Sequence, residues 1–149
     1  MARYYAVGKT QSANWNRPNM TKKNYNIEDL FKALADRTRL RLISLLGDSE
    51  VCVCFLVVIL KTSQPKISRH LAYLRRAGIV AARREGKWMH YSLTEPPDEH
   101  AARIFREVLA SLTEHPEFQR DREKLLQVCC ATQLPVQLRR APRPLQVAA

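Results

Sequence analysis

A chain of 149 residues, 46% of them apolar, is the size of one domain and can bury one modest core. Its formal charge of +11 implies an anionic partner, which is nucleic acid, a membrane surface or an acidic protein. No apolar run approaches the roughly 18 to 20 residues that span a bilayer, and the N-terminus lacks the apolar core of a signal peptide. We therefore expect a cytoplasmic protein that does not act at a membrane.

Both ends of the chain are expected to lie outside the folded unit. Residues 1–24 show no helical or alternating period, and we interpret them as a flexible arm. Residues 131–149 mix Pro135, Pro142 and Pro144 with arginines, a composition that favours disorder. No internal repeat or linker interrupts residues 25–130, so a single domain is expected there.

Helical periodicity runs through the first part of this domain. The first predicted helix has apolar residues at i, i+3, i+4 and i+7, namely Ile27, Leu30, Phe31 and Leu34. Asp36 is expected to cap a second helix, which Gly47 ends. A third helix is expected to run from near Glu50 to near Leu60.

The pattern then changes to a helix followed by a hairpin. Ser63 is a good N-cap for a fourth helix, which stops at Gly78 and buries Ile67, Leu71 and Leu74. Two short strands are predicted at 79–82 and 87–93, with Gly86 in the turn between them. A long last helix follows, which Pro116 breaks or kinks. The predicted fold is therefore mostly helical with a small β-hairpin.

Two short helices joined by a polar turn and followed by a basic hairpin are typical of a winged helix-turn-helix, whose second helix enters the major groove. Residues 61–91 carry eight basic residues and one acidic residue, a local charge of +7. Arg and Gln side chains can bind base edges, while Ser and Lys can hold phosphates. The residues expected to contact DNA are Ser63, Gln64, Lys66, Ser68, Arg69, His70, Tyr73, Arg83, Arg84 and Lys87. A basic helix alone fits a solvated surface equally well, and the charged hairpin favours DNA.

Four segments, 31–40, 50–56, 63–78 and 84–93, resemble the ArsR/SmtB family of metal-responsive repressors. The resemblance covers roughly residues 26–112 in unbroken order, and the segment 63–78 is highly specific. It implies a homodimer that forms through the first and last helices. It also implies repression, because family members bind a palindromic or pseudopalindromic operator in double-stranded DNA when no metal is bound.

The four cysteines form two close pairs, Cys52/Cys54 and Cys129/Cys130. Cytosolic thiols are expected to be reduced, and thiolates are the natural ligands of soft ions. In the family that the chain resembles, a Cys-Val-Cys at the start of the third helix is the arsenic and soft-metal site. The segment Cys52-Val53-Cys54 matches it. The resemblance therefore implies As(III) or Sb(III), or another thiophilic metal ion, as the effector that releases the DNA.

Two positions depart from the family pattern. Phe55 stands where the family usually has Asp, which removes a carboxylate and disfavours harder ions. Val57 stands where arsenic repressors with a local site place a third Cys, so the third thiolate is expected from Cys129 or Cys130. In a regular helix the first two thiols would lie about 200° apart, so chelation is expected to require a distorted first turn.

The second metal site of the family, used for zinc or cobalt, is incomplete in this chain. Asp98, His100 and Glu114 match its pattern, but Ser111 replaces the second His. A lost imidazole normally indicates a vestigial site.

Other functions fit some of the same residues. A reversible disulfide or polysulfide bridge from Cys52 or Cys54 to Cys129 or Cys130 would make the same fold a redox sensor, and a cadmium or zinc sensor is a further alternative. A thiol oxidoreductase is disfavoured, because there is no Cys-x-x-Cys before a helix and no Gly-rich nucleotide loop. We therefore do not expect an enzyme.

Overall fold

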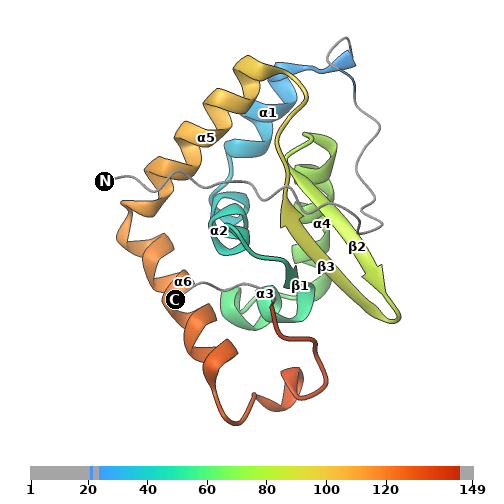
Figure 1. Cartoon of the computed structure of the whole chain (residues 1–149), viewed down its shortest axis with the longest axis vertical. Coiled ribbons are helices and arrows are strands. Elements are labelled where there is room, and N and C mark those ends of the chain that lie inside the picture. Colours follow the sequence, from blue (N-terminus) through green and yellow to red (C-terminus); the bar gives the residue numbers. More distant parts are fainter. Residues whose placement is uncertain (1–20, 22–23, 145–149) are drawn as a thin grey trace.

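The computed structural model describes residue 21 and residues 24–144, and it consists of helices around a small antiparallel sheet (Figure 1). In chain order the elements are α1 (Ile27–Leu34), α2 (Arg37–Leu46), β1 (Val51–Cys52), α3 (Val53–Leu60), α4 (Gln64–Arg76), β2 (Val80–Glu85), β3 (Trp88–Leu93), α5 (Glu99–Thr113), α6 (Pro116–Cys130) and the 3-10 helix η2 (Val136–Leu138). The predicted winged helix-turn-helix fold is confirmed. The arm predicted at 1–24 lies outside the described residues, except for Thr21 and Asn24.

Short polar side chains fix where the helices begin. The Asp36 carboxylate accepts a hydrogen bond of 2.9 Å from the N–H of Arg39 and so caps α2, as predicted. Asp98 caps α5 in the same way, by accepting from the N–H of Ala101 at 3.0 Å. Helix α2 ends at Gly47, which has a φ of +45° and faces the guanidinium of Arg122, so a side chain there would be strained and would clash.

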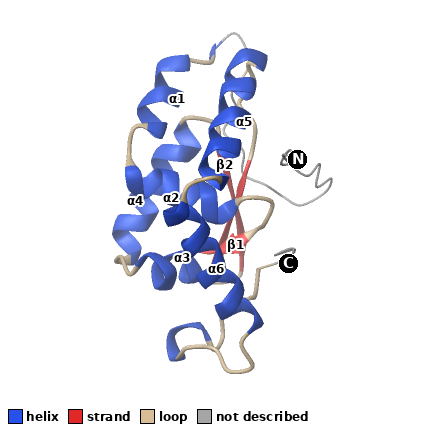
Figure 2. Ribbon diagram, turned by 90° about the vertical axis from the view of Figure 1, so that its left-hand side faces the viewer, coloured by secondary structure: helices blue, strands red, loops and turns tan. Residues whose placement is uncertain are grey.

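The core lies where α2, α3 and α4 meet the sheet, and α5 and α6 pack against α2 (Figure 2). Its largest fully buried side chains include Leu42, Phe55, Leu71 and Phe105. The apolar face of α1 is wider than the surface it packs on, so Phe31 remains 54% exposed although it shares the predicted apolar face with Leu30. No helix in the described part of the chain is long and apolar enough to cross a bilayer.

The third helix begins later than the sequence predicts. Residues Val51 and Cys52 form the short strand β1, which pairs with β3 through Val51↔Tyr91 and Cys52↔His90, and α3 starts only at Val53. The sheet order is β1-β3-β2. A strand partner 38 residues away overrides local helical preference here, which sequence periodicity does not reveal. The start of α3 is therefore tied directly to the hairpin.

Helix α6 is held on α2 by a buried ion pair. The guanidinium of Arg41 donates to both carboxylate oxygens of Asp121, at 2.6 and 2.9 Å, and the Asp121 side chain is only 2% exposed. Burial of one carboxylate without its partner would be costly, so this pair fixes the position of α6. The predicted break at Pro116 is observed, because α5 ends at Thr113 and α6 begins at Pro116.

The chain after α6 packs against the domain, although its composition predicts disorder. We call residues 131–144 the C-terminal segment. Its residue Leu138 is completely buried, Ala141 is buried, and η2 packs against α3. The guanidinium of Arg143 donates to the carbonyl oxygens of Cys129 and Ala131, which ties the segment to the end of α6. A few apolar side chains between prolines suffice to anchor an extended path, and residues 145–149 lie outside the described residues.

Candidate DNA interface and thiol site

Helix α4 presents one polar face to solvent because its other face is fully used in the core. Ile67, Leu71 and Leu74 are completely buried. Four of the residues predicted to contact DNA are exposed, namely Ser63, Gln64, Lys66 and Arg69. Ser68 is half-buried. Ser63 occupies the N-cap position, but its hydroxyl makes no capping hydrogen bond. This face carries the donors and acceptors that recognition of base edges and phosphates requires.

Two residues predicted on this face point toward α2 instead. The Nδ1 atom of His70 lies 3.7 Å from the carboxylate of Asp36, and burial lowers the pKa of His70 although Asp36 opposes this. The ring of Tyr73 lies 4.3 Å below the guanidinium of Arg39. Both side chains therefore help to attach α4 to α2.

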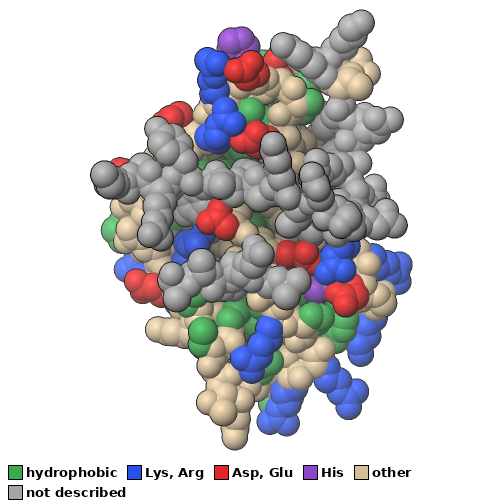
Figure 3. Space-filling view, viewed as in Figure 1, with side chains coloured by type: hydrophobic (Ala, Val, Ile, Leu, Met, Phe, Trp, Pro, Cys, Tyr) green, Lys and Arg blue, Asp and Glu red, His purple; other side chains and the backbone are tan. Residues whose placement is uncertain are grey.

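The hairpin of β2 and β3, which we call the wing, carries exposed cations at its tip. Arg84 donates to the carbonyl of Gly86 at 3.0 Å, and the ammonium of Lys87 lies 4.9 Å from the Trp88 ring. Gly86 has a φ of +57°, which the tight turn requires. Figure 3 shows Lys and Arg side chains gathered along the lower right of the molecule, over the wing and the C-terminal segment. This edge suits contact with a phosphate backbone.

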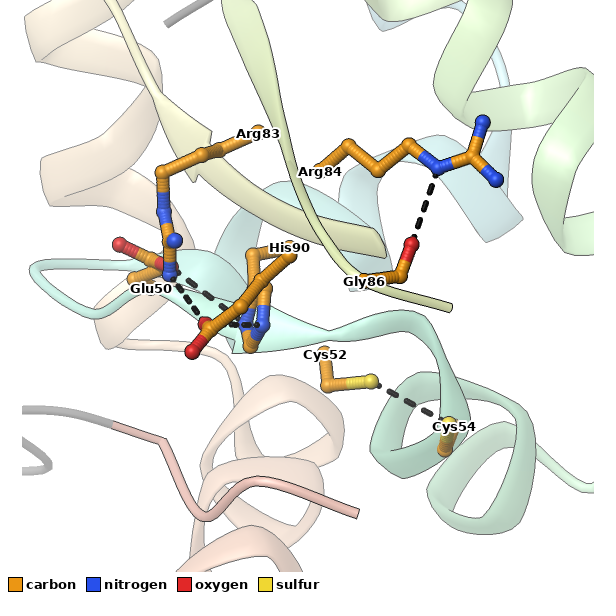
Figure 4. A network of polar contacts seen from close by, with 8 residues as sticks. Glu50, Cys52, Cys54, Arg83, Arg84, Gly86 and His90 are labelled. Carbon is orange, nitrogen blue, oxygen red and sulfur yellow. Dashed lines mark hydrogen bonds and ion pairs between the residues drawn. The ribbon is translucent and has the colours of Figure 1, made fainter. Parts of the chain in front are cut away.

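Arg83, also predicted to contact DNA, belongs to a network along the wing (Figure 4). Its guanidinium donates to Glu50 through Nε at 2.9 Å and through Nη2, and it also pairs with Glu85 at 3.0 Å. His90 lies against both carboxylates and is buried, which lowers its pKa. Sequence reasoning missed Glu50 and His90, since no motif links Glu50 to a partner 33 residues away.

A small cavity of about 150 Å³ opens beside this network. It is lined by Glu50, Arg83, Glu85 and His90 on one side and by Pro142 and Arg143 of the C-terminal segment on the other. The network therefore connects the segment before β1, the wing and the C-terminal segment.

The first cysteine pair is already assembled. The Sγ atoms of Cys52 and Cys54 lie 3.2 Å apart (Figure 4). The two side chains avoid the divergence of about 200° that a regular helix would impose, because Cys52 precedes α3 in an extended conformation and only Cys54 is helical. Cys52 is completely buried, Cys54 is half-buried, and burial raises the pKa of Cys52 to about 12.

The second cysteine pair ends α6 and remains apart from the first. Cys129 is half-buried and Cys130 is exposed, and burial raises the pKa of Cys129 to about 11. Helix α6 packs against α3, yet nowhere in residue 21 and residues 24–144 do three or more Cys, His, Asp or Glu side chains gather as metal ligands. The structure thus brings together two of the four predicted thiol ligands.

Comparison with known proteins identifies the family. Residues 36–82 match the model for the bacterial regulatory protein, arsR family. The arsenical resistance operon repressor of Escherichia coli (strain K12) is 52% identical over 79 residues, which are 52% of this chain and 68% of that repressor. The chain belongs to the arsR family. This family consists of DNA-binding transcriptional regulators and not of enzymes.

The match to a second curated relative covers less of that relative's length. The arsenic resistance transcriptional regulator ArsR1 of Pseudomonas putida is 55% identical over 65 residues, which span 43% of this chain and 51% of that regulator. The chain thus spans about half the length of that relative. Among solved structures, reduced HlyU from Vibrio cholerae has a TM-score of 0.49 at 34% identity and covers 59% of this chain and 88% of HlyU.

The residues that match the second metal site of the family lie at the two ends of α5. The Asp98 carboxylate is used to cap α5, His100 is exposed, and Glu114 follows the end of α5 as its C-cap. Ser111 is exposed and offers no imidazole. In the described part of the chain these residues form no metal-binding cluster.

Proposed function

We propose that this member of the arsR family is a transcriptional repressor that leaves its operator when As(III) or Sb(III) binds the Cys52/Cys54 pair together with a thiolate from Cys129 or Cys130. The names of two relatives, an arsenical resistance operon repressor and an arsenic resistance regulator, support the effector class. The observation that carries the proposal is the 3.2 Å separation of the first two sulfurs.

That separation suits one kind of ion better than another. Two sulfurs bound to one ion at about 2.3 Å lie about 3.3 Å apart when the S–M–S angle is near 90°, and about 3.8 Å apart at the tetrahedral angle. Trivalent arsenic and antimony keep a lone pair and bind thiolates as a pyramid with angles near a right angle, whereas zinc and cadmium thiolate sites are tetrahedral. The 3.2 Å spacing of the two free thiols is nearer to the pyramidal value.

A third ligand has to come from the end of α6. Phe55 and Val57 offer no donor beside the first pair, and Cys129 and Cys130 are the other two thiols of the chain. Cys130 is exposed and one residue from the end of its helix, where a helix frays most readily. Recruitment of this end to the first pair would unwind the last turn of α6 and would pull on the start of α3.

Movement at the start of α3 would also move α4 and the wing, the two parts proposed to contact DNA. Residues 61–63 alone separate α3 from α4, and Cys52 pairs with His90 of the wing. In a dimer the two reading helices must match half-sites at a fixed spacing, so a shift of α3 lowers the affinity for a palindromic operator. We expect dimerisation through α1 and α5, which would cover Phe31 and Ile27, exposed by 54% and 39%.

The effector proposal is tested by fluorescence anisotropy on a duplex that the purified protein selects from random sequence. Arsenite and antimonite should each raise the operator Kd at least about 100-fold, whereas zinc should leave it within about threefold. The effector assignment is wrong if neither arsenite nor antimonite changes the Kd, whether or not cadmium or zinc does.

The DNA-reading proposal is tested on the same duplex. Arg69→Ala should cost about 1 to 3 kcal/mol of specific binding, because Arg69 reads base edges from α4. Arg84→Ala should weaken binding to all sequences and lower the salt slope by about one, because Arg84 binds phosphate. Arg120→Ala removes an exposed charge on α6 and serves as the control, with no change expected. Equal losses for Arg69→Ala and Arg120→Ala would contradict the assignment of α4.

A further inference from the structure

The two thiols of the first pair are positioned for a reaction with each other. Their sulfurs are 3.2 Å apart, and a disulfide bond is about 2.05 Å long, so the gap to close is roughly 1 Å. Cys52 is fixed in β1 by its pairing with the wing, and Cys54 lies in the first turn of α3. Rotation of one side chain can supply a movement of this size.

We propose that hydrogen peroxide oxidises Cys52 and Cys54 to a disulfide, and that this bridge blocks the effector site while the repressor stays on its operator. The blocking role rests on the proposed function of this pair as an effector site, whereas the disulfide itself does not.

The reaction balances within the pair and its oxidant. The sulfur of Cys54 attacks one oxygen of the peroxide, the O–O bond breaks, and a sulfenic acid and one water form. The sulfur of Cys52 then attacks the sulfenic sulfur, the S–O bond breaks, and the hydroxyl leaves as a second water with the Cys52 proton. The two sulfurs together lose two electrons, which reduce the peroxide to two waters.

Burial sets the order of the two steps. Cys54 is half-buried and can meet a small oxidant, whereas Cys52 is completely buried and can act only on its neighbour. The redox alternative that the sequence allows, a bridge from this pair to Cys129 or Cys130, would need the end of α6 to move first. The observed contact favours the bridge inside the pair.

The disulfide should abolish the response to the effector and leave DNA binding unchanged. Both sulfurs are consumed, so no thiolate remains there for a metalloid. A shift of about 1 Å between side chains leaves the pairing of Cys52 with His90 and the Glu50–Arg83 ion pair in place, so the wing keeps its position. A bridge between residues two apart closes a short, strained ring, which reducing thiols open readily.

The test uses the full chain carrying Cys129→Ser and Cys130→Ser, so that only the first pair can react. Peroxide should lower the mass by two hydrogen atoms, and peptide mapping should join Cys52 to Cys54. Before oxidation, phenylarsine oxide, which needs only two thiols, should add once per chain; after oxidation it should not add, and dithiothreitol should restore the addition. Without arsenical, the operator Kd should stay within about threefold when the bridge forms and when dithiothreitol opens it.

The control is the same protein with Cys54→Ser added, which should neither lose two hydrogens nor bind phenylarsine oxide tightly. The proposal is overturned if peroxide only adds oxygen to the pair, if the bridged protein still takes up phenylarsine oxide, or if bridging raises the operator Kd tenfold or more. Arsenite release of the parent protein under reducing conditions tests the proposed function separately, so each can fail without the other.

Discussion

Each cysteine pair of this chain consists of near neighbours in the sequence, but the two pairs differ in burial and in the elements that hold them. Cys52 and Cys54 are held in contact by a strand and a helix start, with one thiol fully buried. Cys129 and Cys130 end a helix, where one is exposed and the backbone carbonyl of the other accepts a hydrogen bond from Arg143. The first pair is therefore preformed, whereas the second pair lies at a helix end that would have to move to join it.

The difference follows from what lies next to each pair along the chain. Val51 and Cys52 pair with the sheet and are buried, so close packing of the core holds the first pair in place. The second pair forms the last two residues of α6, where Cys129 packs against the edge of the core and its carbonyl oxygen accepts a hydrogen bond from Arg143. The variants below test whether the first pair supplies affinity and the second supplies coupling.

The largest effect is expected from Cys54→Ser. A hydroxyl is a poor ligand for a soft ion, so one of the two preformed thiolates is lost. The arsenite concentration that releases half of the operator should rise at least about 100-fold, roughly 2.8 kcal/mol, with the effector-free operator Kd unchanged. Anisotropy titrations measure both quantities, and unaltered release would show that the first pair is not the effector site.

A smaller effect is expected from the second pair. Cys129→Ser and Cys130→Ser together should raise the releasing arsenite concentration about tenfold, because an intramolecular third ligand acts at an effective concentration near the millimolar range. Each single variant should lose less, since the other thiol can substitute. If the double variant matches the parent, two thiolates suffice and the end of α6 has no part in sensing.

Much of the fold could be predicted because it depends on local signals. Helical periodicity, the Asp36 cap and the turn at Gly86 each act over a few residues, and each prediction is confirmed. The strand β1 could not be predicted, because two residues have no period and their pairing partner lies in β3. The anchoring of the C-terminal segment was also missed, since its composition indicates disorder and only the packing of Leu138 reveals order.

The candidate site shows the same division. The spacing of the buried residues of α4 shows which residues lie on its opposite, exposed face. The exposure of residues such as Gln64 and Arg69 could therefore be inferred from spacing alone. Tyr73 and Arg83 were assigned to DNA because of their chemistry, yet Arg39 and Glu50, from other elements, hold them in place. Contacts between distant elements are not encoded in the local pattern, and the meeting of Cys52 and Cys54 depends on such a contact.

A modest gain of sensitivity is expected from Arg143→Ala. The variant removes the two hydrogen bonds to the carbonyls of Cys129 and Ala131, which hold the end of α6 in place. Hydrogen bonds at the surface are each worth well under about 1.5 kcal/mol, so release should need about threefold less arsenite. Arg140→Ala removes an exposed neighbouring charge and should leave the titration unchanged. A loss of sensitivity for Arg143→Ala would mean that the segment presents the thiols rather than restrains them.

The last expected effect, on stability in alkali, separates the two pairs by burial. Burial raises the pKa of Cys52 to about 12 and that of Cys129 to about 11, against an ordinary value of 9.0. An unfolded chain deprotonates these thiols from about pH 9 upward while the folded chain does not. Their contribution to the free energy of unfolding is therefore intact below that pH and falls as the pH rises toward the folded pKa.

Urea unfolding between pH 7 and 11 should therefore show a steep alkaline decline of the free energy of unfolding in the parent. Cys52→Ala should flatten the decline most and Cys129→Ala less, whereas Cys130→Ala, at an exposed site, should follow the parent. Equal slopes for all three variants would contradict this difference in burial between the two pairs.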